Sequence, residues 1–440
     1  MQISKKVTET ILPIYESQDD YTCLYDSVTI DQEIIDSVSS IIKNVREYGD
    51  EALIDYTVQF DKVERDTVTI TLDELDAARD ITYETIHLFT EAAENIKKFH
   101  QQELDSLKNW KIKHSGSYCG RMRTPINRVG IYVPGGTAPY PSSVLMNVIP
   151  AQVAGVREIA LVSPPDSETG QINPYIIATA VLVGVQEIYA LGGAQAIAAL
   201  AYGTESIQSV DKITGPGNIY VTEAKRQIFG KAGIDSLAGP SEIVIFADSD
   251  AEPEWIASDL LSQAEHDVLA RAILISTDRD ILKQSREEVL SQLDSLPRKE
   301  IARTSIMQKG ALILAESLEQ GVEIVNRLAP EHLELMVKDP ENLLNAITSA
   351  GAIFIGDHTP EPVGDYWAGP NHVLPTGGNA RYSSALSVKD FCKWTSIIRF
   401  NRDTLQKHAD KIASFARLEG LEAHARSVER RFKREGKRKK

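Results

Sequence analysis

The sequence predicts an α/β protein with two doubly wound, incomplete Rossmann-like parallel-sheet domains, a helical N-terminal part and a small C-terminal helical arm. The main observation is the alternation of short apolar runs with helix-length segments between Asn127 and Asp357. Such alternation is typical of parallel strands joined by helices that cover both faces of a sheet. The run is too long for a single sheet of ordinary size. We therefore expect two sheets.

The first 110 residues are expected to be mainly helical. Residues 31–61 and 72–102 carry apolar residues at i, i+3 and i+4 spacing with charges between them, the pattern of amphipathic helices. Strands are then expected at residues 128–134, 157–165, 186–191, 209–217, 241–250, 271–277, 310–317 and 351–357. Helices are expected between them at residues 142–156, 172–185, 192–203, 251–267, 278–296 and 317–329.

The two sheets are expected to divide near "AGPSE" (238–242). The predicted parts are an N-terminal arm (1–25), a first α/β domain (26–131 plus 240–380), a second α/β domain (132–239) and a C-terminal arm (381–440). Residues 358–384 are rich in Pro, Gly and Asn, and a connection of this length is usually functional or disordered. Their aromatic and histidine content favours a functional loop. The basic tail is expected to be a solvated end, with a polyanion-binding arm as the alternative.

Composition and charge exclude several classes of protein. The formal net charge of −16 over 440 residues argues against a nucleic-acid binder, which has to neutralise phosphates, and favours a cationic small molecule. Cys23, Cys119 and Cys392 lie far apart, which excludes a disulfide framework or a thiolate zinc site. Basic neighbours make Cys119 a candidate nucleophile for aldehyde chemistry. The N-terminus carries no signal-peptide pattern, and the longest apolar run (175–185) is too short to span a bilayer. We expect a cytoplasmic protein without a membrane segment.

Three turns that contain glycine follow expected strands. They are Tyr132–Gly136, Ala190–Ala196 and Thr214–Asn218. Glycine lets backbone N–H groups approach a ligand, and the helix N-terminus that follows favours a phosphate. None of the turns matches G-x-G-x-x-G, and glycine is also common at such turns for steric reasons alone. Consecutive units would bring all three turns to the carboxyl edge of one sheet, where a nucleotide or another phosphate-bearing ligand could bind.

The second half of the chain holds the candidate chemical groups. Glu331 and His332 follow Pro330 at a predicted helix start, where they could carry protons near neutral pH, or where the acid could simply favour the helix dipole. In "LSQAEHD", Gln263 and His266 lie three residues apart. On a helix they would project from one face, as a solvated polar end or as half of a metal site.

Two further pairs extend this set. Asp365 lies seven residues before His372 in the irregular segment, and Glu419 lies five residues before His424 on a predicted helix. Asp365 and another histidine could complete a metal site with the first pair, although glutamine is an unusual zinc ligand. No G-x-S-x-G pattern of a serine hydrolase is present.

Taken together, these segments resemble the histidinol dehydrogenase family. The resemblance runs from about Asn127 to Glu429, and the helical N-terminal part fits it as well. The segments that carry it are long and follow the family's order. They are "VGIYVPGGTAPYPSSVLMN", "GGAQAIAALAYGT", "ITGPGNIYVTEAKRQ", "GPSEI", "QAEHD", "APEHLEL", "VGDYWAGPNHVLPTGGNARYSSALSVKDF" and "EGLEAHARS".

The resemblance implies NAD-dependent, four-electron oxidation of L-histidinol to L-histidine through the aldehyde, the last step of histidine biosynthesis. It also implies a homodimer with shared active sites and one zinc ion per subunit. The implied catalytic pair is Glu331 and His332. The implied zinc ligands are Gln263, His266, Asp365 and His424, the last from the partner subunit through the C-terminal arm. The implied substrate contacts are Ser241, Gln263, His266, His332, Asp365, His372, Glu419 and His424, and the implied NAD contacts on the second α/β domain are Tyr132, Gln195 and Asn218.

These residue types suit the implied chemistry. Hydride leaves a carbinol carbon as its hydroxyl loses a proton, so a base is needed, and His332 suits that role near pH 7. Glu331 could activate the water that hydrates the aldehyde. In the family, zinc holds the imidazole and amine of the substrate, which makes it mainly an orienting template. Glu419 would be an anionic partner for this cationic substrate.

Two alternatives remain open. One is a related zinc- and NAD-dependent dehydrogenase of another small polyol, such as a sulfonated propanediol; Glu419 and His424 favour histidinol instead. The other is a zinc-stabilised binding protein without catalysis. The pair Glu331 and His332, beside three turns of nucleotide-binding type, argues against it. The basic tail is not part of the family pattern.

Overall fold

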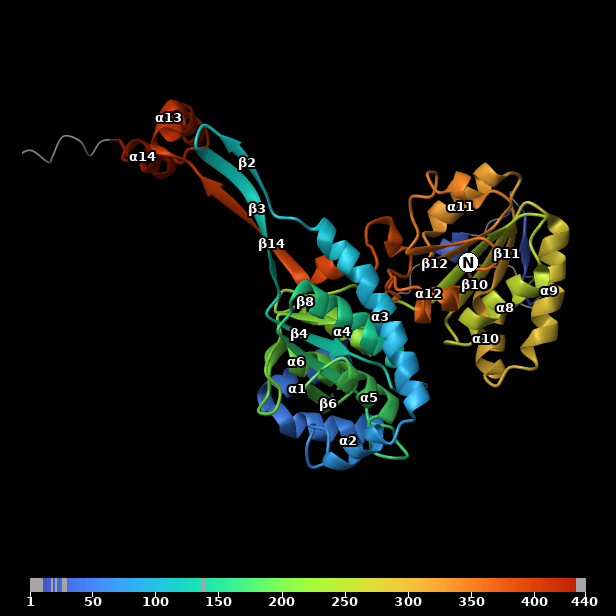
Figure 1. Cartoon of the computed structure of the whole chain (residues 1–440). Helices are drawn as coiled ribbons and strands as arrows, with labels where there is room; N and C mark the ends of the chain where they lie inside the picture. The colour runs from blue at the N-terminus through green and yellow to red at the C-terminus, as the bar shows by residue number, and fades with distance from the viewer. Residues whose placement is uncertain (1–10, 17–18, 20–21, 26–29, 136–138, 433–440) are drawn as a thin grey trace, which may run out of the picture. The chain divides into compact units, whose positions relative to one another are not determined.

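The computed structural model describes residues 11–16, 19, 22–25, 30–135 and 139–432 (Figure 1). The basic tail from residue 433 and residues 1–10 of the expected N-terminal arm lie outside this range. The chain forms two compact units, one from residues 1–103 and 126–391, the other from residues 104–125 and 392–440. Within the described range, no helix has both the length and the apolar character that crossing a membrane requires.

The first unit contains a five-stranded parallel sheet in the order β6-β5-β4-β7-β8. Its strands are β4 (Arg128–Tyr132), β5 (Glu158–Ser163), β6 (Glu187–Ala190), β7 (Lys212–Thr214) and β8 (Gly233–Ile234). Numbered along the chain, this order is 3-2-1-4-5, the Rossmann order with one strand fewer, as the sequence predicts. Successive strands are added on one side of β4 up to β6 and on its other side from β7 onward, so the strand order reverses between β4 and β7. Their carboxyl ends therefore form the crevice where ligands bind in open α/β sheets.

Two groups of helices accompany this sheet. The first group is α1 (Gln32–Tyr56), α6 (Gly193–Tyr202) and α7 (Ile219–Ile228), which pack on one another. The second is α2 (Leu72–Arg79), α4 (Pro141–Ala154) and α5 (Pro174–Leu182), joined by contacts of α5 with the other two. The first group shares a core with Ala160 and Val162 of β5. The intervening Leu161 points to the opposite face, because side chains alternate along a strand.

The helices of the N-terminal part do not follow the predicted division. Residues 26–131 were expected to join residues 240–380, whereas α1 packs on α6 and α7, and β4 is the central strand of the five-stranded sheet. α3 (Tyr83–Ser106) follows α2. The packing of α1 differs from the prediction because an amphipathic helix has one apolar stripe, and the stripe does not specify which of two sheets the helix will cover.

A second parallel sheet has the order β1-β11-β10-β9-β12-β13. Its strands are β1 (Ile14–Tyr15), β9 (Glu242–Ala247), β10 (Arg271–Ser276), β11 (Ala311–Leu314), β12 (His332–Met336) and β13 (Ala352–Ile355). Its helices are α8 (Pro253–Ala264), α9 (Arg279–Leu293), α10 (Lys299–Lys309), α11 (Leu318–Leu328) and α12 (Glu361–Tyr366). Shorter helical turns are η1 (Thr22–Tyr25), η2 (Thr57–Asp61), η3 (Pro340–Leu343), η4 (Asn379–Arg381) and η5 (Val388–Phe391).

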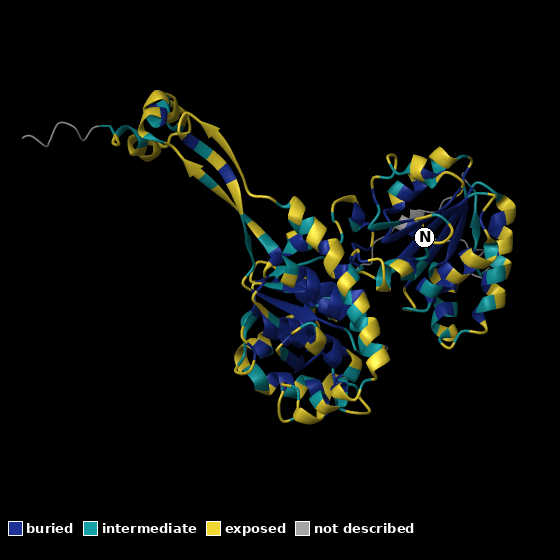
Figure 2. Ribbon diagram, viewed as in Figure 1, coloured by how far each residue is buried: buried dark blue, intermediate teal, exposed yellow. Residues whose placement is uncertain are grey.

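Both faces of this second sheet are buried. Ile243 and Ile245 of β9 pack with α8, α9 and α10, and the alternate residues Val244 and Phe246 pack with α11. Figure 2 shows the central strands buried and the outer faces of the helices exposed. Such burial on both faces explains why these strands are continuous apolar runs in the sequence.

β12 is a strand where the sequence predicted a helix start. All five residues of "HLELM" are buried. Leu333 and Leu335 join the core with α11, so His332 and Glu334 point to the opposite face. The alternation of polar and apolar residues was a strand signal, but Pro330 and an acidic residue are equally typical of a helix N-terminus.

The second unit is not purely helical, which corrects the predicted C-terminal arm. An antiparallel sheet of β2 (Trp110–His114), β3 (Ser117–Pro125) and β14 (Cys392–Arg399) accompanies the packed helices α13 (Arg402–Leu418) and α14 (Glu422–Glu429). The β2–β3 hairpin turns at Ser115 (φ 47°) and Gly116 (φ 78°), the positive values of a two-residue type I′ turn. Because β2 is exposed throughout, no buried face gave the strand a clear pattern.

Candidate active site

Chemically active side chains gather at the amino ends of β9 and β12. His332 is the first residue of β12, and its Cα lies opposite Ile243 of β9 and Ala352 of β13. Glu331 precedes it, and Glu242 begins β9. Ligands of open α/β sheets usually bind at the carboxyl edge. This cluster lies at the other edge, so fold-level reasoning from the sequence would not have placed it there.

The imidazole of His332 is held through Nδ1. This atom lies 3.1 Å from the carbonyl oxygen of Glu242, which can only accept, so Nδ1 carries the proton of that hydrogen bond. Glu331 Oε2 lies 3.8 Å from the same nitrogen and accepts the backbone N–H of Glu242 at 3.0 Å. His332 Nε2 is buried without a hydrogen-bond partner among the described residues. The structure therefore brings the predicted catalytic pair together and leaves Nε2 for another group.

Two carboxyl groups of α12 and a second histidine face that nitrogen. His332 Nε2 lies 3.8 Å from Asp365 Oδ1 and 3.9 Å from Glu361 Oε1. His372 Nδ1 lies 3.9 Å from Asp365 Oδ1. Possible ligand atoms of His332, Glu361 and Asp365 all lie within 4.8 Å of one another, close enough to hold a metal ion. Sequence reasoning missed Glu361, although it lies one helical turn before Asp365 and shares its helix face.

The end of α8 carries the other predicted ligands. Gln263 lies in the last helical turn, is 1% exposed, and its Oε1 has no hydrogen-bond partner within the described part of the chain. The helix ends at Ala264, and the N–H of His266 still donates to the Gln263 carbonyl at 3.2 Å. Burial lowers the pKa of His266, and the nearby Asp365 carboxylate only partly offsets this. A neutral ring of this kind can bind a cation.

The electrostatics of the site come from burial and from several acids around two imidazoles. Burial raises the pKa of Glu331 to about 8, against the effect of His332. Burial disfavours the charged ring of His332, but Glu331, Asp365 and Glu361 outweigh it and raise its pKa to about 10. Burial also opposes ionisation of Asp365, but His332 and His372 lower its pKa to about 2. The site is thus a dry, acid-rich environment that favours cationic groups.

A cavity of ≈ 370 Å³ adjoins this cluster. Its polar lining includes His266, Asp365 and Arg298. Aromatic and aliphatic side chains complete it, namely Leu88, Phe89, Ile96, Tyr140, Leu145, Tyr366 and Trp367. An apolar hollow with a few convergent polar groups is the usual form of a small-molecule site. A ligand in this cavity would meet two of the predicted metal ligands directly.

The residues predicted to contact NAD lie at the carboxyl edge of the five-stranded sheet. Tyr132 ends β4, and its hydroxyl oxygen accepts the N–H of Gly193 at 3.2 Å. Both amide atoms of Gln195 are buried without hydrogen-bond partners in the described range. Asn218 caps α7 by accepting N–H groups of Tyr220 and Val221. The three glycine turns therefore meet at one edge, as predicted, except that Gly136 lies outside the described residues.

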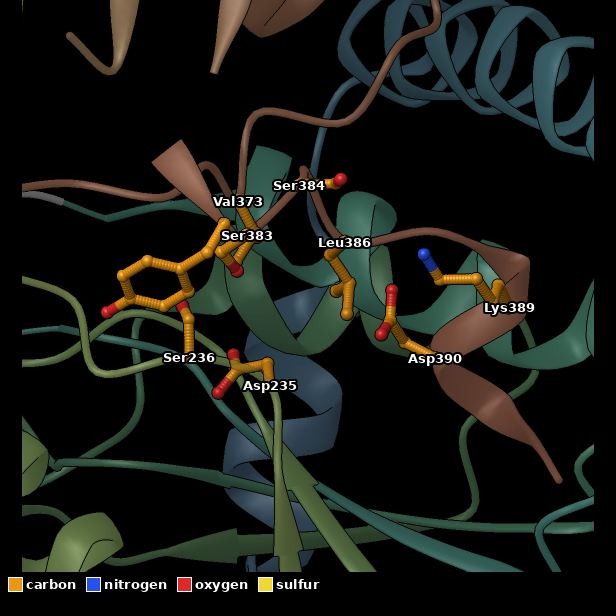
Figure 3. A pocket seen from close by; sticks show the side chains of 9 residues that line it. Asp235, Ser236, Val373, Ser383, Ser384, Leu386, Lys389 and Asp390 are labelled. Carbon is orange, nitrogen blue, oxygen red and sulfur yellow. The ribbon is translucent and has the colours of Figure 1, made fainter. Parts of the chain in front are cut away.

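A second, smaller hollow of ≈ 150 Å³ lies beside Val373, the residue after His372, and Figure 3 shows its lining. Its two carboxylates, Asp235 and Asp390, already have partners. Asp235 accepts the N–H of Gly215 and pairs with Lys225. Asp390 accepts the N–H and O–H of Ser387. We assign no ligand to this hollow.

Four other residues were considered from the sequence, and none of them takes part in the contacts described above. They are Ser241, Glu419, His424 and Cys119. Ser241 immediately precedes β9, and its carbonyl accepts the N–H of Arg271 at 3.0 Å. Glu419 and His424 belong to the second unit, at the end of α13 and on α14, and both are exposed. Cys119 is exposed on β3 of the same unit. The geometry around the cavity thus involves acids, imidazoles and an amide but no thiol.

Comparison with known proteins shows the family to which the chain belongs. The family model described as histidinol dehydrogenase matches residues 26–432. The histidinol dehydrogenase of Geobacillus kaustophilus is 52% identical over 400 residues, covering 90% of this chain and 94% of its own length. That of Bacillus subtilis is 51% identical, covering 90% and 93%. The crystal structure of histidinol dehydrogenase from Elizabethkingia anophelis is 40% identical with a TM-score of 0.90, covering 96% of this chain and 98% of that one. The chain therefore belongs to the histidinol dehydrogenase family.

Proposed function

We propose that this protein oxidises L-histidinol to L-histidine through the aldehyde with two equivalents of NAD, as the last step of histidine biosynthesis in the cytoplasm. The observation that carries the proposal is the buried pair of Glu331 and His332. The free Nε2 of His332 faces Asp365 and Glu361, and Asp365 lines a cavity of ≈ 370 Å³. Acid-rich surroundings suit a substrate that carries an ammonium group and an imidazole.

Gln263, His266 and Asp365 would hold a zinc ion, with His424 of the partner subunit as the fourth ligand. The unpartnered Oε1 of Gln263 and the lowered pKa of His266 fit such a role, as does the low pKa of Asp365, about 2. When bound, the ion would hold the imidazole and amine of the substrate and offset part of the carboxylate charge around the base. Glu361 and His332, which lie near Asp365, form the alternative ligand set.

His332 and Glu331 would divide the proton transfers. With only the acids around it, the His332 ring would be protonated near neutral pH, because its pKa is about 10. A zinc ion bound among these carboxylates would lower this pKa, and Nε2 of the neutral ring would then take the carbinol proton as hydride leaves the same carbon for the nicotinamide. Water then adds to the aldehyde while Glu331 accepts one of its protons. After His332 has released the first proton to solvent, Nε2 would take a proton of the resulting diol as the second hydride leaves for a second NAD. The sum is one histidinol, two NAD and one water converted to histidine, two NADH and protons.

Glu331 is suited to transient protonation. Burial raises its pKa to about 8, so a proton from water can be taken up and released near neutral pH. The hydrogen bond from the N–H of Glu242 holds its Oε2 in place. His372, partly buried beside Asp365 and with no hydrogen-bond partner for Nδ1 among the described residues, would contact the substrate, as would Ser241.

Tyr132, Gln195 and Asn218 would hold the dinucleotide at the carboxyl edge of the five-stranded sheet. The two unpartnered amide atoms of Gln195 fit a ligand with donors and acceptors, such as a ribose or an amide. Bound NAD supplies the hydride acceptor. The turn that begins α6 supports close approach of a ligand, because Gly193 has φ +64° and carries no side chain.

A homodimer with shared sites would complete the active site. Large apolar side chains of the second unit are exposed, including Ile398 (74%), Phe415 (66%) and Leu418 (86%). Contiguous exposed apolar surface is typical of an interface, and these side chains are candidates for one. His424 and Glu419 lie in the same unit and are exposed, so a partner chain could receive them. Glu419 would then face the ammonium group of the substrate.

The function is tested by incubating the zinc-loaded protein with L-histidinol and NAD. We expect about two NADH per histidinol, loss of turnover after chelation, and recovery with zinc. A sulfonated propanediol serves as the competing substrate and should give little NADH. Absence of NADH from metal-replete protein with histidinol would refute the proposal, and faster turnover of the propanediol would favour the polyol alternative.

A further inference from the structure

A buried ion pair lies beside the turn that joins β7 to α7. Its members are Lys225 on α7 and Asp235, the residue after β8, and their side chains are only 3% and 4% exposed. A buried pair is weak evidence for stability, because taking two charges out of water costs about as much free energy as their attraction returns. The groups that the pair contacts are therefore more informative than its presence.

Both members of the pair are hydrogen-bonded to the same turn residue. Asp235 Oδ2 accepts the N–H of Gly215 at 2.8 Å, and Lys225 Nζ donates to the Gly215 carbonyl at 2.8 Å. Together with the ion pair, these bonds close a ring through the N–H and C=O of one residue. Gly215 has φ +117°, a conformation that glycine adopts readily and other residues rarely. Because glycine is also the least restrained residue, the ring fixes a backbone that would otherwise rotate freely.

The same turn connects two of the residues proposed to contact NAD. Asn218 caps α7 three residues after Gly215, and Lys225 lies seven residues after Asn218, two helical turns along the same face. A Cβ at Gly215 would overlap the carbonyl oxygen of Tyr132, so the turn packs directly against the end of β4. A shift of Gly215 would therefore move Asn218 relative to the end of β4, across the crevice between β4 and β7.

We propose that Lys225 and Asp235 are positioning residues for the dinucleotide, which hold the Gly215–Asn218 turn against β4 at the carboxyl edge of the five-stranded sheet. The inference rests on the proposed function, which assigns NAD contacts to Tyr132 and Asn218. A turn held in this way is ordered before NAD arrives, so binding does not have to supply the free energy of ordering it. Both residues act through the turn and need no contact with NAD.

Two variants separate the hydrogen bonds of the pair from its charge. Lys225→Met keeps a long unbranched side chain, but it removes the bond to the Gly215 carbonyl and leaves the Asp235 carboxylate without its cation. Lys225→Met combined with Asp235→Asn removes both charges, so the net charge equals that of the unmodified protein. In this double variant the new amide oxygen can still accept the N–H of Gly215, whereas the Gly215 carbonyl has lost its donor.

Arg128→Met is the matched control. Arg128 begins β4 and forms a bidentate pair with Glu187 at 2.7 and 2.6 Å, and its side chain is 6% exposed. It lies at the amino end of the strand that ends at Tyr132. The control therefore also removes a buried cation from the same sheet, but at the edge away from the proposed NAD contacts.

The experiment measures NADH affinity by fluorescence titration, the KM values for NAD and for histidinol, and unfolding in urea. Both Lys225 variants should raise the Kd of NADH and the KM for NAD about 10-fold, the loss expected for roughly one well-placed hydrogen bond. The KM for histidinol at saturating NAD should stay within about threefold, because the proposed histidinol site lies on the other sheet. Arg128→Met should unfold at lower urea concentration yet keep all three values within about threefold.

Several outcomes would overturn the inference. Normal NADH affinity in both Lys225 variants would show that the pair does not position the turn. Normal affinity in the double variant alone would assign the effect to the unpaired charge of Asp235, and an equal loss in Arg128→Met would assign it to general loosening of the sheet.

Two further outcomes are covered by the same measurements. If Lys225→Met does not fold, the double variant decides, since it buries no unpaired charge. Unmodified protein that binds NADH but does not oxidise histidinol would refute the proposed function, while the NADH affinities of the variants would still support or overturn the positioning role.

Discussion

At the scale of single residues, a backbone atom decides what the catalytic histidine can do. The carbonyl of Glu242 accepts from Nδ1 of His332, which directs Nε2 toward Asp365 and Glu361 at 3.8 and 3.9 Å. In the neutral ring this hydrogen bond keeps the proton on Nδ1, so Nε2 is the nitrogen that accepts a proton. This contact joins residues 90 positions apart in the sequence.

His332→Asn should reduce kcat about 10²- to 10⁴-fold, because the amide cannot act as a general base. Its side chain can still donate toward the Glu242 carbonyl, so the local structure should persist. The zinc content, measured by atomic absorption, should stay close to one ion per subunit. Loss of the metal together with activity would instead favour the ligand set of His332, Glu361 and Asp365.

Gly193→Ala should weaken NADH binding. A Cβ at Gly193 would approach Gln195 Oε1 to 2.6 Å and displace an amide proposed to contact the dinucleotide. Loss of one hydrogen bond of about 0.5–1.5 kcal/mol corresponds to about 2- to 10-fold in affinity, measurable by NADH fluorescence titration. Gly184→Ala is the control, because Gly184 also has positive φ (+80°) but no atom within 4 Å of the added Cβ. Equal effects of the two substitutions would point to backbone strain alone.

At the scale of elements, α2 is held to the five-stranded sheet region by one carboxylate. Glu74 forms a capping box with Thr71, accepts the N–H of Ile172 at 3.0 Å, and pairs with Arg65 at 2.9 Å. Burial opposes its ionisation, but these hydrogen bonds outweigh burial and lower the pKa of Glu74. The Glu74 carboxylate therefore caps the N-terminus of α2, accepts a backbone N–H from a loop and forms an ion pair with Arg65.

Glu74→Gln should lower the free energy of unfolding near neutral pH by about 1–3 kcal/mol, the range for a hydrogen bond to a charged group. Because the folded-state pKa is depressed, the ionised form stabilises the protein above its ordinary pKa, and this stability is lost as pH falls through the folded pKa. Urea unfolding at neutral and acidic pH should therefore show a gap between the two proteins that narrows in acid. A gap independent of pH would contradict the ionised role.

Some strands could be recognised from the sequence and others could not. The central strands of both parallel sheets were predictable because burial on both faces makes them continuous apolar runs, as in "EIVIFA" of β9. The two-residue strands β1 and β8 were not predicted, because they are too short to show a pattern. β12 was mistaken for a helix start because its His332 and Glu334 interrupt such a run. The β2–β3 hairpin has Ser-Gly at its turn, residues 115 and 116, but β2 is exposed throughout and has no apolar face that would mark it as a strand.

At the scale of the whole molecule, the proposed site needs residues of the second unit from another chain. Coexpression or mixed refolding of His332→Asn and His424→Asn chains tests this. In a mixed dimer with two-fold symmetry, one site would contain both substitutions and the other neither. Random pairing should restore about a quarter of the normal sites, since half of the dimers are mixed.

Each variant refolded with itself is the control and should remain inactive. Sedimentation should show dimers in all samples. If the mixture gains no activity although mixed dimers are present, the site is built within one chain, and the proposed role of the partner subunit's His424 would be wrong.

The sequence by itself determined the α/β class, the two doubly wound sheets and membership of the histidinol dehydrogenase family, because periodicity and long motifs are local properties of the chain. It also named Gln263, His266, Glu331, His332 and Asp365. Only the tertiary structure decided that three further acids, one each from β9, β12 and α12, lie near these side chains, and that the cluster lies at an amino edge. Glu242, Glu334 and Glu361 acquire their contacts from strand register and helix packing. Such contacts join distant segments, which spacing along the chain cannot show.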